Sequence, residues 1–411
     1  MNYDDTLKYI HSAPKVAKKL GNAALATALK KLGNPHKKLK YIHIAGTNGK
    51  GSTSAMTDSV LRKAGYTTGL FTSPYIERFN ERIKVNGNDI PDAELVKCTE
   101  KVKKCIEEHN LEIAEFSIIF LVGILYFLDK KCDIVVLETG LGGRLDATNV
   151  IEENLACAIT SIGFDHVQYL GNTIEKITYE KAGIIKNRSY VVLYPNPDKK
   201  VLNVVSSVAK EKDAHLIITD QPLIVSKNHF IYQGEELELS LEGKYQFSNA
   251  SVCLEIINTL KNRGYTITAK HIKDGLKSVC WPGRFEWLNP NLVLDGCHNE
   301  EGVDKFAESA KDIPEPVTIV TGVMSDKDYR AIAEKLSQIS KDIIITKPSE
   351  VRSLEPDEFK KIFAEIGVNA LVVPNPEDAV NTALKKGGVC AVCGSLYLIG
   401  EIRKKFKNQI T

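Results

Sequence analysis

Residues 41–53 read Tyr41-Ile42-His43-Ile44-Ala45-Gly46-Thr47-Asn48-Gly49-Lys50-Gly51-Ser52-Thr53. The run from Tyr41 to Ala45 predicts a strand, and the spacing of Ser52 to Ala64 predicts a helix directly after a glycine-rich turn. Such a turn lets backbone amides surround a phosphate, and the start of the helix adds positive potential. We therefore predict a phosphate-binding loop in which Lys50 reaches the terminal phosphates and Ser52 offers a hydroxyl to phosphate or metal.

This loop is a variant of the common phosphate loop. The distant glycine of the usual pattern is absent, and Gly51 stands where serine or threonine is expected. The competing interpretation is a structural turn with a solvated lysine. Two glycines flanking Lys50 at a helix start favour phosphate binding over that interpretation.

The rest of the chain alternates apolar, β-branched runs with amphipathic stretches such as Ala93 to His109. This alternation is typical of parallel strands joined by helices, so we predict an α/β fold. Further strands are expected at Ile134 to Glu138, Leu155 to Ile162, Tyr190 to Tyr194, Val317 to Thr321, Ile343 to Ile345 and Val389 to Val392.

The length of 411 residues indicates at least two domains. Short alternating runs at Phe230 to Tyr232 and Leu237 to Leu241, with a Gly-Glu-Glu turn between them, predict a small antiparallel appendage. Turn-forming residues cluster between Trp281 and Asn291, before a new series of strands and helices. We place the domain boundary there, with one domain at residues 1–288 and the other at residues 289–411.

The composition excludes several classes of protein. With 54 Lys and Arg against 52 Asp and Glu, the net charge of +2 gives no general attraction to nucleic acid or membrane. The acidic N-terminus has no basic segment followed by an apolar run, so no signal peptide is expected. Phe116 to Leu128 is too short to span a bilayer and predicts a buried helix. We expect a cytoplasmic enzyme that acts as a monomer.

Nine cysteines are scattered through the chain without a disulfide pattern, which favours a reducing compartment. Cys390 and Cys393 form the single close pair. Because β-branched residues surround this pair, we expect a core strand there, and a redox or zinc site is the alternative.

Several short motifs, in this order and spacing, resemble the folylpolyglutamate synthase branch of the Mur ligase superfamily. The resemblance begins at the loop of Gly46 to Ser52 and covers nearly the whole chain. It implies an N-terminal phosphate-loop ATPase domain with a mostly parallel sheet, a C-terminal Rossmann-like domain, and an active site in the cleft between them. The other matching segments are residues 71–75, 78–83, 138–149, 165–166, 180–186, 246–249, 282–284, 295–299, 326–328 and 394–398.

The resemblance also implies the reaction, which is ATP-dependent addition of L-glutamate to the γ-carboxylate of a reduced folate through an acyl phosphate. Phosphorylation gives the carboxylate a leaving group, and cations must surround the transferring phosphoryl group. Glu138 ends an apolar strand, at the edge where open α/β sheets bind ligands. With Ser73 and His166, it is implied to hold Mg²⁺, although an imidazole is an unusual ligand for that ion.

Nucleotide and catalytic roles follow from the same resemblance. The family carries a carbamylated lysine at the position of Lys181, which would turn a cation into an anion that helps to hold magnesium. Lys50, Lys181 and His298 are the expected catalytic residues, and His298 is expected to handle the incoming glutamate or phosphate. The residues expected to bind ATP are Asn48, Gly49, Lys50, Gly51, Ser52, Asn249, Arg284 and Asp295.

The folate is expected to contact Arg82, Phe116, Leu145, Asp146 and Ala147. Relatives often carry Phe-Glu where this chain has Phe116-Ser117, so one acidic contact to the pterin differs. Dihydropteroate is a second candidate substrate, because bacterial members of the branch handle both compounds.

Three other functions share some of these sequence features. A Mur-type ligase of cell-wall precursors would share ATP and magnesium, but residues 78–83 and 140–149 argue against it. A GTPase switch would need an Asn-Lys-x-Asp segment, which the sequence lacks. A binding module without catalysis would leave Lys50, Glu138, His166 and Lys181 without a purpose.

Overall fold

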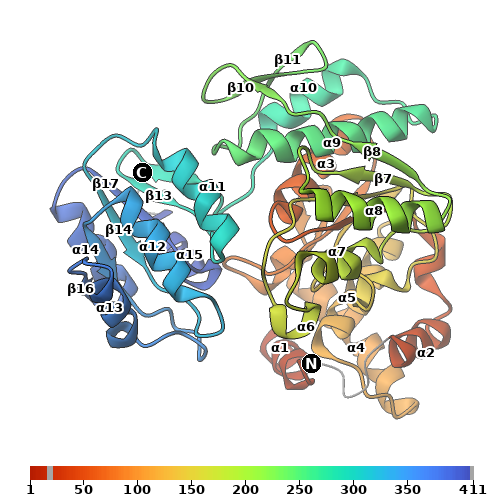
Figure 1. Ribbon diagram of the computed structural model, residues 1–411. Coiled ribbons are helices and arrows are strands. Elements are labelled where there is room, and N and C mark those ends of the chain that lie inside the picture. Colours follow the sequence, from red (N-terminus) through yellow and green to blue (C-terminus); the bar gives the residue numbers. More distant parts are fainter. Residues whose placement is uncertain (16–21, 408–411) are drawn as a thin grey trace.

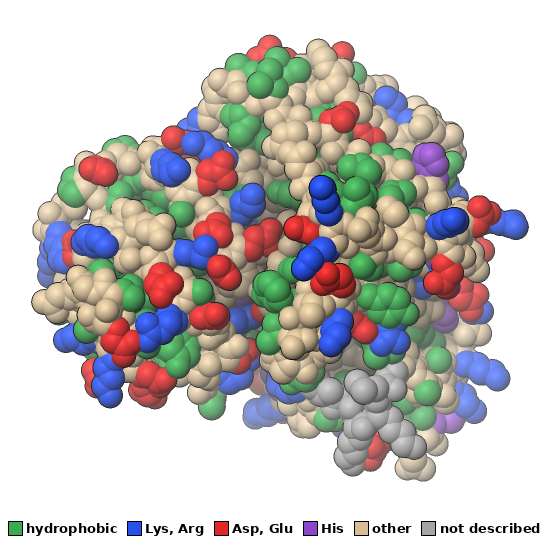
Figure 2. Space-filling model, in the orientation of Figure 1, with side chains coloured by type: hydrophobic (Ala, Val, Ile, Leu, Met, Phe, Trp, Pro, Cys, Tyr) green, Lys and Arg blue, Asp and Glu red, His purple; other side chains and the backbone are tan. Residues whose placement is uncertain are grey.

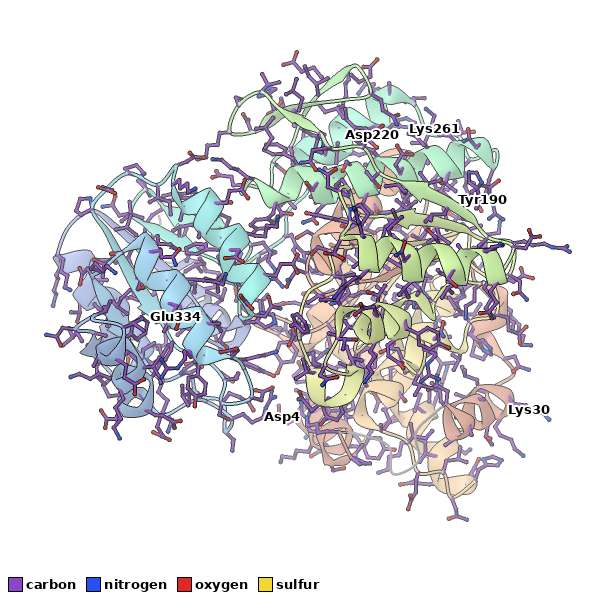
Figure 3. The ribbon with its side chains drawn as sticks, in the orientation of Figure 1. Asp4, Lys30, Tyr190, Asp220, Lys261 and Glu334 are labelled. Carbon is purple, nitrogen blue, oxygen red and sulfur yellow. The ribbon has the colours of Figure 1, made fainter. Side chains whose placement is uncertain are left out.

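The computed structural model describes residues 1–15 and 22–407, which form two lobes side by side (Figure 1). The N-terminal lobe contains the elements up to α10 (Ala269–Ser278), and the C-terminal lobe begins with β12 (Glu286–Asn289). In Figure 3, Lys261 marks α9 (Tyr245–Asn262) of the first lobe, and Glu334 marks α12 (Tyr329–Ile339) of the second. The space-filling view shows acidic and basic side chains mixed on the visible face of both lobes (Figure 2), in line with the net charge of +2.

An eight-stranded sheet lies at the centre of the N-terminal lobe, in the order β4-β3-β2-β5-β1-β6-β7-β8. The six strands from β2 to β8 in that order are parallel, whereas β3 and β4 join antiparallel at one edge. This arrangement confirms the predicted mostly parallel sheet. The strands are β1 (Tyr41–Ala45), β2 (Thr68–Phe71), β3 (Ile83–Val85), β4 (Asn88–Asp89), β5 (Ile134–Glu138), β6 (Ala156–Ile159), β7 (Tyr190–Leu193) and β8 (His215–Ile218).

Helices cover both faces of this sheet, so its central strands are apolar on both sides. One face packs against α3 (Lys50–Lys63), α9 and α10. The opposite face packs against α5 (Glu115–Asp129), the buried helix expected near Phe116 to Leu128, and against α7 (Ile174–Ala182) and α8 (Lys199–Glu211). Three further helices share the core around α5, where α1 (Tyr3–Ser12) and α4 (Asp92–Glu108) contact α5, and α2 (Ala23–Lys31) contacts α4. Shorter helical segments are η1 (Pro35–Lys38), η2 (Phe79–Arg82), η3 (Ala147–Val150) and α6 (Val167–Leu170).

The predicted antiparallel appendage is a three-stranded sheet in the order β11-β10-β9, formed by β9 (Leu223–Ile224), β10 (His229–Tyr232) and β11 (Glu235–Glu238). The position of its turn differs from the expected Gly-Glu-Glu. Gln233 and Gly234 both have positive φ and form a two-residue turn, so Glu235 and Glu236 already pair with β10. The strand therefore begins and ends earlier than the predicted Leu237 to Leu241.

The C-terminal lobe is a second layered α/β unit, with a six-stranded sheet in the order β12-β13-β17-β14-β15-β16. All neighbours are parallel except β12 and β13. The predicted boundary between residues 288 and 289 falls inside β12, which pairs with this second sheet. The remaining elements are β13 (Leu292–Leu294), α11 (Glu300–Ala310), β14 (Val317–Thr321), α12, β15 (Ile343–Ile345), α13 (Pro356–Glu365), β16 (Leu371–Val372), α14 (Pro376–Lys385), β17 (Val389–Cys393) and α15 (Leu396–Phe406).

All nine cysteines lie in the described part of the chain, and all are free thiols. Cys390 and Cys393 both belong to β17, as expected, but they pack into the apolar layers on opposite faces of the sheet. This placement removes the redox or zinc alternative for the pair. Across residues 1–15 and 22–407, no helix is both long and apolar enough to cross a bilayer.

The carboxyl ends of the central strands in the two sheets carry the loops that face one another. In the first lobe these loops follow β1, β2, β5 and β6, and in the second lobe they follow β13, β14 and β17. In open α/β sheets this edge binds ligands, because the strand ends and the helix starts leave backbone groups free there.

Candidate active site between the lobes

The phosphate loop runs from β1 into α3 through two glycines that no other residue could replace without strain. Gly46 has a φ of 154° and Gly49 a φ of 88°, and α3 begins at Lys50. A Cβ atom on Gly46 would lie 1.8 Å from the Oγ1 of Thr160, and one on Gly49 would lie 2.3 Å from the Oδ1 of Asn249. Both glycines therefore serve close packing as well as the turn.

The ammonium of Lys50 folds back over this loop. Its Nζ donates to the carbonyl oxygens of Gly46 and Thr47, both at 3.2 Å. A phosphate that enters the loop would offer a stronger, charged acceptor at the same place. The geometry therefore fits the expected role of Lys50.

A cavity of about 250 Å³ lies above the loop and receives side chains from both lobes. It brings together the three expected catalytic residues, the three expected magnesium ligands and most of the expected ATP ligands. Its lining includes Asn48, Gly49, Lys50, Gly51, Ser52, Ser73, Glu138, His166, Lys181, Arg284 and His298.

Glu138 is a buried carboxylate, with 4% of its surface exposed. Its Oε2 accepts a hydrogen bond from the backbone nitrogen of Ser73 at 3.1 Å. Burial raises the pKa of Glu138, and the charges of Lys50 and Arg284 only partly offset this effect. A divalent cation beside Glu138 would remove this cost, so the residue fits a metal site.

The other expected magnesium ligands lie on two further loops around the same cavity. Ser73 follows β2, and His166 has a φ of 50° at the start of α6. Burial lowers the pKa of His166, which favours the neutral imidazole that binds metals. Within the described residues, His, Cys, Asp and Glu alone form no cluster of three that could hold a metal ion. A magnesium site here therefore needs the hydroxyl of Ser73 or a further oxygen ligand.

Lys181 is buried, with 4% of its surface exposed, and its Nζ donates to the carbonyl oxygen of Gly46 at 2.6 Å. Burial, reinforced by the charge of Lys50, lowers the pKa of Lys181 to about 7. About half of the amine is then unprotonated at neutral pH, and the unprotonated amine is the form that reacts with carbon dioxide. Its chemistry therefore fits the expected carbamate.

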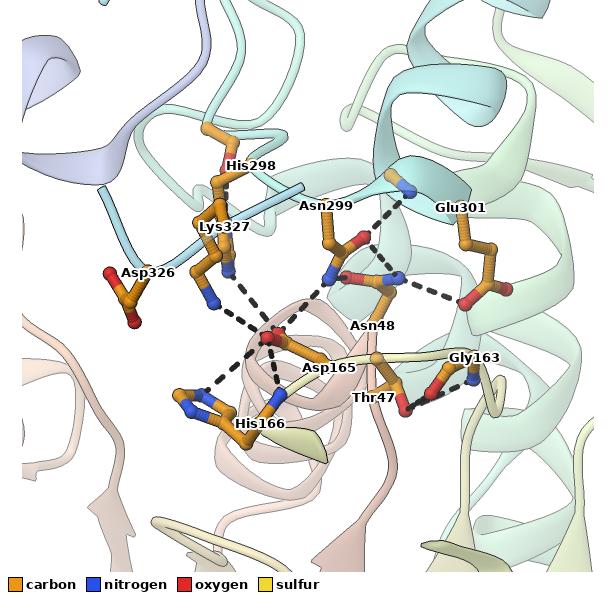
Figure 4. Close-up of polar contacts among 12 residues, drawn as sticks. Thr47, Asn48, Gly163, Asp165, His166, His298, Asn299, Glu301, Asp326 and Lys327 are labelled. Atoms are coloured by element: carbon orange, nitrogen blue, oxygen red, sulfur yellow. Dashed lines mark hydrogen bonds and ion pairs between the residues drawn. The ribbon is translucent and has the colours of Figure 1, made fainter. Parts of the chain in front are cut away.

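Asp165 is the centre of an ionic network that links the two lobes (Figure 4). Its Oδ1 accepts from the Nζ of Lys327 at 2.6 Å, and its Oδ2 accepts from the Nδ2 of Asn299 at 3.1 Å and lies 3.8 Å from the Nε2 of His298. Although burial alone would raise the pKa of Asp165, its electrostatic interactions with the His298 imidazole and the Lys327 ammonium hold it well below its usual value. Asp165 thus stays ionised and binds the C-terminal lobe.

His298 is held in one tautomer by its neighbour. Its Nδ1 lies 2.8 Å from the carbonyl oxygen of Gly296, and because a carbonyl only accepts, this nitrogen carries the proton. Burial and the charge of Lys327 lower the pKa of His298 to about 4. The imidazole is therefore neutral at pH 7, with its lone pair on Nε2.

A second set of cross-lobe bonds reaches the phosphate loop itself (Figure 4). The Nδ2 of Asn48 donates to the Oδ1 of Asn299 at 3.1 Å and to the Oε2 of Glu301 at 2.9 Å. In return, the Nδ2 of Asn299 donates to the Oδ1 of Asn48 at 3.2 Å. The position of the C-terminal lobe and the conformation of the phosphate loop are thus coupled.

Asn249 and Asp295, the two remaining expected ATP ligands, lie beside the loop in a small cavity of about 40 Å³ that Asn48, Ser52 and Arg284 also line. Asp295 is fully buried and accepts from the hydroxyl of Tyr245 at 2.7 Å and from the backbone nitrogen of Cys297 at 2.8 Å. Burial raises its pKa. These contacts fix the turn that carries His298.

The expected folate residues do not line the central cavity, although they adjoin it. Phe116 packs against Gly140, where an added Cβ would lie 2.5 Å from the ring, and Gly140 lines the cavity. Asp146 is buried and accepts from the backbone nitrogens of Leu141 and Thr148 at 2.8 and 3.0 Å, so in this structure its carboxylate holds the loop. Ala147 is buried beside it, and Leu145 is exposed.

Arg82 lies deeper, over the rings of Tyr75 and Phe79, at 5.1 and 5.7 Å from the ring centres. Its Nε is buried and has no hydrogen-bond partner among the described residues. A buried donor without an acceptor is costly. Arg82 therefore has the capacity to bind an anion that enters from the cleft.

Two family models match the chain. The Mur ligase middle domain matches residues 44–257, and the Mur ligase glutamate ligase domain matches residues 283–396. "Dihydrofolate synthase/folylpolyglutamate synthase" of Bacillus subtilis is 36% identical over 98% of this chain and 99% of its own length. Folylpolyglutamate synthase of Lacticaseibacillus casei is 33% identical over 98% of each chain. The chain belongs to the folylpolyglutamate synthase branch of the Mur ligase family.

Solved structures agree with this membership. The folylpolyglutamate synthase of Mycobacterium tuberculosis complexed with ADP and AMPPCP has a TM-score of 0.89 and 25% identity, over 98% of this chain and 99% of that one. The predicted family and the predicted α/β fold are thereby confirmed. As a Mur ligase, the chain is an ATP-dependent enzyme that forms amide bonds.

Sequence reasoning assigned no role to several residues that organise this Mur ligase cleft. Asp165 and Lys327 lie in segments that matched the family, but a single sequence does not show that they pair across the lobes. Asn299 and Glu301 likewise follow His298 without a distinctive spacing. The signal that could have found them is their position in the segments that follow β6, β13 and β14, at the edge where ligands bind.

Proposed function

We propose that this enzyme is a folylpolyglutamate synthase, which adds L-glutamate to the γ-carboxylate of a reduced folate at the expense of ATP. The observation that carries the proposal is the convergence of Lys50, Glu138, Lys181 and His298 on one cavity between the lobes. Both basic and acidic side chains line this cavity, and a reaction between a phosphate and two anionic substrates needs cations around the transferring group.

In the first step, a γ-carboxylate oxygen of the folate attacks the γ-phosphorus of ATP, and the bond to ADP breaks. Lys50 and the amides of the loop neutralise charge on the transferring group. Arg284 lines the same cavity from the segment that leads into the C-terminal lobe, where it can meet the same phosphate when the lobes close. The product is an acyl phosphate.

In the second step, the amino group of glutamate attacks the acyl carbon, inorganic phosphate leaves, and one proton is lost from the nitrogen. His298 is neutral, and its Nε2 can accept a hydrogen bond from that amine. Lys327 and Arg352, which also line the cavity, supply positive charge for the carboxylates of the incoming glutamate.

Ser73, Glu138 and His166 are the residues that would hold Mg²⁺, with a carbamate on Lys181 as an anionic partner. When bound, the ion would neutralise phosphate oxygens and align the reacting groups. The raised pKa of the buried Glu138 and the lowered pKa of Lys181 both support this assignment.

The folate would occupy the side of the cleft formed by the loop after β5 and by the loop that contains Arg82. Arg82 would bind a carboxylate of the folate, and Phe116 would pack behind Gly140 against the aromatic part. We also propose that the enzyme is a cytoplasmic monomer, since nine free thiols suit a reducing compartment.

A substrate panel tests the proposal. Purified enzyme with ATP and L-glutamate is given tetrahydrofolate, its methylene derivative or dihydropteroate, and the products are identified by mass. We expect extension of the reduced folates, with ATP hydrolysis that requires both folate and glutamate. Turnover of dihydropteroate alone would make the enzyme a dihydrofolate synthase, and nucleotide hydrolysis without either substrate would contradict a ligase.

A further inference from the structure

Outside the reaction cavity, a partly buried ion cluster joins the two lobes a second time. Its centre is Glu77, whose side chain is 8% exposed and lies in the loop of residues 73–82. Arg403 of α15 binds its Oε1, and the Nζ of Lys407 binds its Oε2 at 2.5 Å. Burial alone would raise the pKa of Glu77, but these two cations hold it below its usual value. The carboxylate therefore stays charged and paired.

Arg403 also binds a second acid, next to the connection between the lobes. Its Nε donates to the Oε1 and Oε2 of Glu286 at 3.0 and 2.9 Å. The Oε2 of Glu286 accepts from the backbone nitrogen of Gly283 at 2.7 Å. Because Arg284 lies between Gly283 and Glu286, one guanidinium fixes the segment that presents Arg284 to the cavity.

Internal hydrogen bonds hold the 73–82 loop in one shape, so a movement of Glu77 would also move Ser73 and Arg82 at its two ends. Glu81 accepts hydrogen bonds from the backbone nitrogens of Ile76, Glu77 and Arg78 at 2.8, 3.0 and 2.8 Å. At the base of the loop, the nitrogen of Thr72 donates to the carbonyl of Arg82 at 3.0 Å. The loop is thus a closed unit that starts at Ser73 and ends at Arg82.

α15 packs in close contact with this loop. A Cβ atom on Gly400 would lie 2.0 Å from the carbonyl oxygen of Ile76, and one on Gly283 would lie 2.9 Å from Ile399. The first residues of the same helix, Leu396 and Tyr397, line the reaction cavity. The loop, the Arg284 segment and α15 therefore meet at a single side chain, Arg403.

We propose that Arg403 is a positioning residue for the ligase reaction, and this inference rests on the function proposed above. By binding Glu77 and Glu286 together, it holds the 73–82 loop at a fixed place relative to the C-terminal lobe. Ser73 and Arg82, at the two ends of that loop, then come into place as the lobes close. Arg403 thereby couples substrate binding on the loop to closure of the lobes.

The test compares Arg403→Gln, Arg403→Lys, Glu77→Gln and the double variant Glu77→Gln/Arg403→Gln with the wild type. Lys405→Gln is the matched control, because Lys405 is exposed on the same helix and pairs only with Glu377 among the described residues, at 3.3 Å. Initial rates give KM for folate, KM for ATP and kcat, and hydrogen exchange is followed in peptides that cover residues 73–82.

We expect Arg403→Gln to lower kcat/KM for folate by about 2- to 30-fold, the usual range for residues that couple two sites. KM for folate should change more than KM for ATP, since the phosphate loop keeps its own contacts. Glu77→Gln should behave alike, the double variant should be no worse than either single variant, and Arg403→Lys should recover part of the loss. Lys405→Gln should match the wild type.

A lower melting temperature with unchanged KM and kcat would overturn the proposal, as would additive effects of the two single variants. If the wild type turned over no folate, the proposed function would fail, but hydrogen exchange would still decide this inference. Faster exchange in residues 73–82 of Arg403→Gln than of Lys405→Gln supports the positioning role, and equal exchange refutes it.

Discussion

Replacing Lys181 with Met should stabilise the ligand-free enzyme while it destroys activity. Burial, which leaves 4% of the residue surface exposed, lowers the pKa of Lys181 from 10.5 to about 7. Each pKa unit corresponds to about 1.36 kcal/mol, so the lowered pKa of Lys181 reduces the free energy of unfolding by at most about 5 kcal/mol. About 4 kcal/mol of this reduction is present at pH 7. Methionine has a similar shape and no charge. The variant also loses the hydrogen bond to Gly46, which costs about 1 kcal/mol. Its free energy of unfolding should therefore exceed that of the wild type by about 3 kcal/mol.

The pH dependence has a definite sign. Between pH 7 and 10.5 the unfolded chain binds a proton at Lys181 that the folded chain does not, so the free energy of unfolding of the wild type should rise with pH through that window. Lys181→Met lacks this contribution. The advantage of the variant should therefore be largest at pH 7 or below and should vanish near pH 10.5.

Urea unfolding followed by circular dichroism measures the difference, in carbonate-free buffer without nucleotide or magnesium. Lys176→Met is the matched control, because Lys176 is exposed on the same helix, α7. A difference between the wild type and Lys181→Met that stays constant from pH 7 to 10.5 would refute the reasoning, and so would destabilisation of the variant at pH 7.

Three further predictions concern the reaction itself. Lys50→Ala should remove ATP turnover and keep the wild-type circular dichroism spectrum, since the loop lysine packs against no core; wild-type rates with an unchanged KM for ATP would contradict the phosphate loop. Gly49→Ala should weaken ATP binding at least tenfold by calorimetry, because a positive φ costs about 1–2 kcal/mol and the new Cβ would lie 2.3 Å from Asn249; unchanged affinity would contradict this packing. Folate labelled with ¹⁸O in its γ-carboxylate should transfer one label to the released phosphate, detected by mass spectrometry, and phosphate without label would exclude the acyl phosphate.

The phosphate loop and the sheet around it could be predicted because their signals are local. The strand from Tyr41 to Ala45, the glycines and the helix start follow one another in the chain, and each has its own residue preferences. Glu138 was similarly marked by its place at the end of an apolar strand. These predictions needed no knowledge of which segments meet in space.

The contacts that complete the cleft could not be predicted in this way. Asn48 and Asn299 are 251 residues apart, and Asp165 and Lys327 are 162 apart, so their pairing depends on how two lobes pack. The roles of Asp146 and Arg82 also depend on burial, which covers the carboxylate of Asp146 with backbone amides and leaves the Nε of Arg82 without an acceptor among the described residues. The position of the turn at Gln233 could not be predicted for the same reason, because pairing with β10 decides where the next strand begins.

The cross-lobe bonds of Asn48 also set a rule for building chimeras within the Mur ligase family. A C-terminal lobe grafted from another member would keep its own six-stranded core, since that core is separate from the core of the first lobe. It would nevertheless leave the side-chain amide of Asn48 without its acceptors and the carboxylate of Asp165 without its cross-lobe cation unless Asn299, Glu301 and Lys327 came with it. A functional exchange of lobes in this family therefore requires that the contacting residues of the two lobes match. These residues are few, so they can be introduced together with the grafted lobe.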